Sequence, residues 1–148
     1  MTEKGRLSDK AVSTFQGDFV CSQAVFSTYA PLLGLDRETA LRISNGFGGG
    51  MARMGETCGA LTGAFMLMGL KYGADQPGQE THKEKTYEMI RNLVSQFEKE
   101  FGTIRCRELL SCDISTPEGR QNAKVRDLFN QLCPKYVKFS AELIEKVL

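Results

Sequence analysis

The segment that most constrains the fold is CGALTGAFMLMGL, thirteen residues from Cys58 to Leu70 that carry no charge. A helix that is apolar nearly all round belongs in the interior of a protein. The segment is too short for a membrane span, which needs about 18 apolar residues or more. We therefore expect a buried helix over residues 56–72, closed by Gly73. Gly59 and Gly63 are four residues apart on it, so another backbone or a cofactor can approach that face closely.

Turn and cap signals divide the rest of the chain into further helices. Asp36 precedes RETALRIS, and Thr116-Pro117 opens another helical segment. Helices are expected at residues 18–33, 37–44, 80–101, 105–110, 117–132 and 134–148. There is no alternating strand pattern and no internal repeat. The sequence therefore predicts a single all-α domain over residues 1–148, an irregular bundle of five to seven helices around a central buried Gly/Ala-rich helix.

The charge balance excludes several classes of function. Nineteen basic residues against eighteen acidic ones give a net charge of +1, which provides no broad basic field for nucleic acid or anionic lipid. The first residues, MTEKGRLSDK, are polar and lack an apolar signal core, so we expect a cytoplasmic protein with no membrane span. In GMARMGET, Glu56 stands where a phosphate-binding loop needs lysine, which argues against nucleotide phosphate as the ligand.

Cysteine usage is the most informative part of the composition. A cytoplasmic compartment keeps thiols reduced, so structural disulfides are not expected. Four of the five thiols fall in the first turn of a predicted helix. With Asp18 and Thr103 as N-caps, Cys21 and Cys106 are each the third residue of their helix. Cys58 is the third helical residue if Gly55 is the N-cap and the first if Thr57 is. Cys133 is itself the N-cap before Pro134. Cys112 lies in a predicted loop, and its role is open.

A helix start favours a thiolate over a thiol. Its first turn presents unpaired N–H groups and the positive end of the helix dipole. The dipole is worth at most ~2 kcal/mol, which lowers a thiol pKa by roughly one unit. Several thiolates brought together would repel one another, whereas a bound metal would hold them deprotonated.

The glycine-rich stretch before Cys58 has two interpretations. Gly46, Gly48, Gly49 and Gly50 could turn their amides inward and form a nest that stabilises thiolates or a cofactor. Alternatively, these glycines only make a tight connection between two helices. The sequence leaves both open.

The cysteine pattern resembles that of a family of redox-active proteins named for C…CGAxxG…C…C. The matching pieces are Cys21 in DFVCSQAV, Cys58 in GFGGGMARMGETCGALTG, Cys106 in RCRELL and Cys133 in LCPKYV. The resemblance covers about residues 18–148 in order. It implies a small all-helical protein that is redox-active through these four cysteines, with an iron–sulfur cluster as the suspected cofactor.

Three hypotheses for the function follow. In the first, Cys21, Cys58, Cys106 and Cys133 converge to ligate an iron–sulfur cluster or another thiophilic metal for electron transfer, with Gly48, Gly49, Gly50 and Gly59 around the cofactor. In the second, two cysteines cycle between dithiol and disulfide without metal. In the third, the chain is a structural or interaction protein, with a structural metal as one form. No CxxC pair selects among them.

The sequence does not name the redox partner protein, and it does not decide between an oxidoreductase and an electron carrier. Small glycine-lined helix faces favour a homodimer.

Overall fold

The computed structural model describes residues 3–148, with side chains from Leu7 onward. This part of the chain is all-helical, which confirms the predicted class, and its only extended pairing is one isolated bridge between Thr57 and Arg105. It contains eight α-helices, more than the five to seven expected. The elements are α1 (Glu3–Gln16), α2 (Cys21–Tyr29), η1 (Ala30–Leu33), α3 (Arg37–Ser44), η2 (Asn45–Phe47), α4 (Gly59–Tyr72), α5 (Glu80–Phe101), α6 (Cys106–Leu110), α7 (Pro117–Val125) and α8 (Leu128–Glu145).

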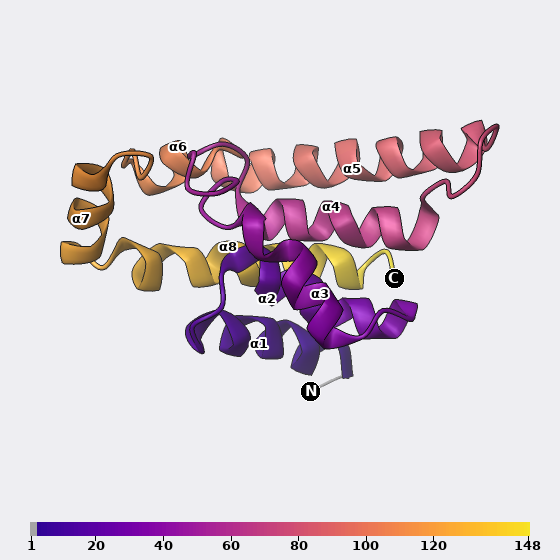
Figure 1. Cartoon of the computed structure of the whole chain (residues 1–148), viewed down its shortest axis with the longest axis horizontal. Coiled ribbons are helices and arrows are strands. Elements are labelled where there is room, and N and C mark those ends of the chain that lie inside the picture. Colours follow the sequence, from indigo (N-terminus) through magenta and orange to yellow (C-terminus); the bar gives the residue numbers. More distant parts are fainter. Residues whose placement is uncertain (1–2) are drawn as a thin grey trace.

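Helix α4 is buried, as its composition predicts. It packs against α2, α5 and α8, and Figure 1 shows it lying between α5 and α8. Its small residues let α2 come close: a Cβ built on Gly63 would lie 2.8 Å from the carbonyl oxygen of Ser22. The glycine face of α4 therefore receives a second backbone. The loss of helix propensity at Gly63, about 1 kcal/mol relative to alanine, is offset by this packing.

Helix α1 was not expected from the sequence. Its residues are mostly polar, but Leu7, Ala11 and Phe15 recur every four positions and form one apolar stripe. This stripe packs against α2 and α8, and Ala11 is fully buried. The recurrence of apolar residues every four positions is the sequence pattern that indicates this helix.

The predicted boundary at Pro134 is wrong. Helix α7 ends at Val125, the chain turns at Asp127 with a φ of 54°, and α8 then runs straight through Pro134. A proline inside a helix removes one hydrogen bond and costs about 3 kcal/mol. The packing of Val137 and Ile144, both fully buried, compensates for that loss.

An aromatic cluster joins α5 to α8 near one end of the bundle. Phe101 contacts Tyr136 edge-on with ring centroids 4.9 Å apart, and Phe97 and Phe139 extend the cluster. Such contacts fix the direction of the Tyr136 ring. No helix of the described residues is long and apolar enough to cross a membrane.

Candidate functional site

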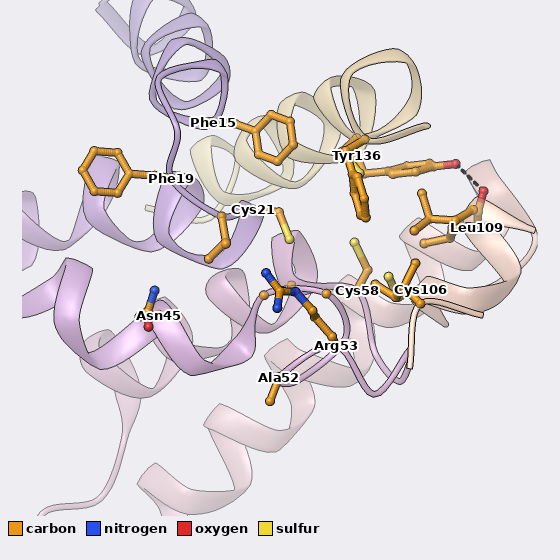
Figure 2. Close-up of a pocket in the computed structure, with 18 of the residues that line it drawn as sticks. Phe15, Phe19, Cys21, Asn45, Ala52, Arg53, Cys58, Cys106, Leu109 and Tyr136 are labelled. Carbon is orange, nitrogen blue, oxygen red and sulfur yellow. Dashed lines mark hydrogen bonds between the residues drawn. The ribbon is translucent and has the colours of Figure 1, made fainter. Parts of the chain in front are cut away.

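A cavity of about 690 Å³ lies at the end of the bundle where the glycine loop, residues 46–57, meets α2, α6 and α8. Four cysteines from four different segments line it: Cys21, Cys58, Cys106 and Cys133. In Figure 2 the side chains of Cys21, Cys58 and Cys106 extend toward a common space beside Tyr136. Cys112 does not line the cavity; its thiol donates to the carbonyl oxygen of Gly119 at 3.2 Å.

Cys21 is the first residue of α2, not the third. Val20 is the N-cap, and its N–H donates to Oε1 of Gln23 at 3.0 Å, which closes the first turn. Asp18 is therefore not the cap; it lies in the preceding turn with a φ of 77°. The sulfur of Cys21 packs directly on α4, because a Cβ built on Gly59 would lie 2.5 Å from it. Only glycine fits at position 59 without displacing Cys21.

Backbone pairing brings Cys58 and Cys106 together across 48 residues of sequence. The N–H of Cys58 donates to the carbonyl oxygen of Ile104 at 2.7 Å, and the N–H of Cys106 donates to that of Glu56 at 2.6 Å. Cys58 is the N-cap of α4 itself, and Cys106 is the first residue of α6 after Arg105. Thr103, the predicted cap, instead accepts a hydrogen bond from the Arg105 N–H.

Arg107 strengthens the same junction. Its Nη2 donates to the carbonyl oxygen of Met54 at 2.6 Å and lies 3.4 Å from Oε1 of Glu56. Glu56 also faces Arg105, at 3.6 Å. Because both cations hold one carboxylate on the loop, α6 and the glycine loop form a single unit.

Cys133 does not begin a helix. It lies in the second turn of α8, one turn before Tyr136, and it is half-buried. The hydroxyl of Tyr136 donates to the carbonyl oxygen of Leu109 at 3.1 Å, which ties α8 to α6 across the cavity (Figure 2). The predicted cap at Cys133 is wrong because Pro134 lies inside α8 and does not start a helix.

The glycine loop contains a left-handed turn. Five consecutive residues, from Gly49 to Arg53, have φ between 50° and 68°. Three of them are not glycine, and each costs roughly 1–2 kcal/mol in this conformation. Long-reach backbone bonds hold the turn, from the N–H of Ala52 to the oxygen of Gly46 at 2.8 Å and from that of Glu56 to Gly50 at 3.0 Å.

The four glycines assigned to a cofactor have different structural roles. Gly48, Gly49 and Gly59 line the cavity, whereas Gly50 does not. A Cβ on Gly48 would lie 2.6 Å from that of Val20, and one on Gly50 would lie 2.8 Å from that of Cys106, so both glycines allow close packing. Of the three that line the cavity, Gly49 is the one whose N–H acts on a thiol, because it helps to lower the pKa of Cys21.

The pKa of Cys21 is lowered from its ordinary value of 9.0 to about 7. The largest cause is a hydrogen bond from the thiol of Cys58, and the N–H groups of Gly49, Ser22 and Cys21 itself add to it. Burial opposes the shift. Hydrogen bonds to the charged form lower the pKa of an acid, so Cys21 is about half ionised at neutral pH.

The other three thiols of the cavity stay protonated. The bond to Cys21, together with burial, raises the pKa of Cys58 well above its ordinary value. Burial raises the pKa of Cys106 to about 12 and also raises that of Cys133. Cys21 is thus the thiol of the cavity that ionises most readily.

No three His, Cys, Asp or Glu side chains of the described residues are gathered closely enough to hold a metal ion. A tetrahedral zinc site needs sulfurs within about 2.3 Å of one ion. Among the described residues, the four thiols line one cavity without three of them lying within such reach of one point.

Sequence reasoning missed the polar and aromatic parts of the cavity, above all Arg53 and Tyr136. Tyr136 follows Cys133 by three residues, so a continuous helix would have placed both on one face. No sequence pattern predicts that Arg53 lines the cavity, because its position depends on the left-handed turn.

Comparison with curated proteins and with solved structures found no match. A family model described as "Putative redox-active protein (C_GCAxxG_C_C)" matches residues 19–147. In this chain the central motif reads CGALTG, and all four cysteines of the cavity lie within the matched residues. The chain belongs to this family.

Proposed function

We propose that this protein is a thiol redox protein in which Cys21 and Cys58 cycle between dithiol and disulfide. The observation that carries the proposal is the packing of the Cys21 sulfur on Gly59, the residue that follows Cys58, with both thiols on one cavity. The interaction between the two thiols separates their pKa values, lowering that of Cys21 and raising that of Cys58. A thiolate beside a protonated partner is the arrangement that thiol–disulfide exchange requires.

The reaction has two steps. The Cys21 thiolate attacks one sulfur of a disulfide, a mixed disulfide forms, and the other sulfur leaves as a thiolate. Cys58 then gives up its proton and attacks the Cys21 sulfur, so that a Cys21–Cys58 disulfide forms and the second thiolate leaves. The incoming disulfide gains the two electrons that the two cysteines lose, and the single proton of Cys58 passes to one of the two leaving thiolates.

The surroundings assign roles to the two sulfurs. The N–H groups of Gly49 and Ser22 stabilise the Cys21 thiolate before attack. Cys58 keeps its proton while Cys21 is charged, because two adjacent thiolates would repel each other. Once Cys21 is in a mixed disulfide its charge is gone, so the pKa of Cys58 falls and the second step can proceed.

Trapping the oxidised protein tests this proposal. Reduced protein is titrated with a glutathione redox buffer, free thiols are alkylated, and the digest is analysed by mass spectrometry. We expect a peptide cross-linked through Cys21 and Cys58, formed equally in a Cys112→Ser variant because Cys112 lies outside the cavity. A cross-link between any other pair, or none in a fully oxidising buffer, would contradict the proposal.

A second function, electron transfer by an iron–sulfur cluster or another thiophilic metal held by Cys21, Cys58, Cys106 and Cys133, is supported by the position of all four on one cavity. Such a cluster supplies one-electron chemistry, and the Gly49 amide would stabilise the charge on its Cys21 ligand.

Metal analysis separates the two functions. Protein purified without oxygen is assayed for iron, sulfide and zinc, and its visible absorption is recorded. Iron and sulfide near stoichiometric amounts, lost in each of the four Cys→Ser variants, would favour the cluster. Metal-free protein that forms the Cys21–Cys58 disulfide supports the dithiol.

A further inference from the structure

Arg53 is the only basic residue among the described residues that line the cavity. Its side chain is exposed and makes no hydrogen bond or ion pair within residues 7–148. By contrast, the nearby Arg105 and Arg107 are both paired with Glu56. Arg53 is therefore a cation available to a ligand in the cavity.

The backbone holds Arg53 in an unfavourable conformation at this place. Its φ is 63°, in the left-handed region that favours glycine. The same turn carries the Gly49 amide that donates to Cys21, and a Cβ on Gly49 would lie 3.0 Å from the Arg53 Cα. One strained turn thus carries both Gly49, whose N–H acts on the Cys21 sulfur, and Arg53, a second residue of the same cavity wall. In Figure 2 the Arg53 side chain extends from the loop toward Cys21.

The remaining walls of the cavity fit a small organic molecule. Its volume of about 690 Å³ lies within the ~300–1,000 Å³ typical of small-ligand sites. Phe15, Phe129 and Tyr136 line it with aromatic rings, and Leu109 adds an aliphatic wall. The cavity is lined by one basic residue, Arg53, and one acidic residue, Asp18, so its aromatic walls fit a ligand with an apolar body and a carboxylate that pairs with Arg53.

We infer that this cavity binds a small disulfide that carries a carboxylate, with Arg53 binding the carboxylate and Cys21 facing the sulfurs. The inference rests on the dithiol function proposed above. The guanidinium of Arg53 is the positively charged group on the cavity wall with which the carboxylate can pair. In the step that follows, the substrate S–S bond breaks, a Cys21–substrate disulfide forms, and the leaving thiolate takes up a proton from solvent.

The test compares two chromogenic disulfides of similar shape. Dithiobis(nitrobenzoate) carries carboxylates and dithiodipyridine carries none. Fully reduced protein with Cys112→Ser as background is mixed with each probe at neutral pH, and the released thiol is followed by absorbance in a single turnover. We expect Arg53→Gln to lower the ratio of the two rate constants, charged probe over neutral probe, by about tenfold, as loss of one charge-assisted contact predicts.

Arg53→Lys is the matched variant. It keeps the positive charge and should retain most of the preference for the charged probe. If Arg53→Gln leaves the ratio unchanged, or if Arg53→Lys lowers it as much as glutamine does, the inference is overturned.

Cys21→Ser distinguishes this failure from that of the proposed function. It should remove the fast phase with both probes. A fast phase that persists in Cys21→Ser refutes the dithiol function, and the inference with it. If the fast phase is lost in Cys21→Ser but the ratio of the rate constants does not change in Arg53→Gln, the inference is overturned and the dithiol function is not.

Discussion

Cys21 and Cys106 each begin a helix and each line the same cavity, but the pKa of Cys21 is lowered to about 7 and that of Cys106 is raised to about 12. The two helix starts differ in where their first N–H groups point. At α2, the N–H groups of Cys21 and Ser22 donate to the Cys21 sulfur. At α6, those of Cys106 and Arg107 donate to carbonyl oxygens of Glu56 and Gly55.

A cysteine at a helix start is therefore not by itself a reactive thiol. At α6 the amides hold the glycine loop in place, so no backbone N–H offsets burial, which is the largest cause of the raised pKa of Cys106. At α2 the same amides, joined by Gly49 and Cys58, act on the sulfur and outweigh burial. One cavity therefore contains a helix start with a structural role, that of α6, and a helix start that lowers the pKa of a thiol, that of α2.

The largest expected effect comes from removing the reactive thiol. At neutral pH, Cys21→Ser in a Cys112→Ser background should slow alkylation by iodoacetamide at least about a hundredfold. The remaining thiols are almost fully protonated, and their higher intrinsic nucleophilicity offsets only part of the lost thiolate. The rate is measured by mass spectrometry of the labelled protein. Cys106→Ser should keep the fast phase; its loss there would mean that the two helix starts do not differ as described.

The next effect tests the contact that positions Cys21. Gly59→Ala should lower the free energy of unfolding by about 1–3 kcal/mol, because its Cβ would overlap the Cys21 sulfur and lie 2.9 Å from the carbonyl oxygen of Phe47. Gly69→Ala is the control on the same helix. Nothing lies within 4 Å of its Cβ, so it should raise stability by up to about 1 kcal/mol. Urea denaturation of both variants measures the difference, and equal changes would refute the contact.

A smaller effect is expected from Cys58 variants, which separate the contribution of the Cys58 thiol to the pKa of Cys21 from that of the backbone amides. Cys58→Ala removes the largest cause of the lowered pKa of Cys21 and should move its alkylation midpoint to higher pH. Cys58→Ser keeps a hydroxyl donor and should move the midpoint less. Midpoints that are the same in wild type and Cys58→Ala would show that the backbone amides act alone.

The smallest effect concerns the strained turn that carries the Gly49 amide. Ala52 has a φ of 50°, so Ala52→Gly should stabilise the protein by about 1 kcal/mol. Ala74, exposed and outside the positive-φ residues, is the control, and Ala74→Gly should not stabilise. Denaturation midpoints measure both, and destabilisation by Ala52→Gly would contradict the strain at this turn.

The sequence predicted the elements that follow local rules. The Asp36 cap of α3, the span of α5 and the buried face of α4 are set by nearby residues, and the structure bears them out. Whether Pro134 starts a helix or lies inside one depends on how strongly α8 is packed, and a local sequence pattern does not report that packing. The stripe on α1 was visible but sparse.

The site was predicted in part. Cys58 and Cys106 meet on the cavity through long-range pairing between the glycine loop and α6, which no spacing revealed. The direction of each first-turn amide also depends on that pairing. A cysteine near a helix start could be recognised from sequence, but the difference between Cys21 and Cys106 could not.

The most direct test of the account is the pH dependence of Cys21 alkylation in the reduced wild-type protein, followed peptide by peptide. The thiolate is the reacting form, so the rate rises with pH and levels off above the pKa of the thiol. The account predicts a midpoint near pH 7 for Cys21 and no midpoint at neutral pH for Cys106. A Cys21 rate that still rises at pH 9.0, the ordinary thiol value, would contradict it.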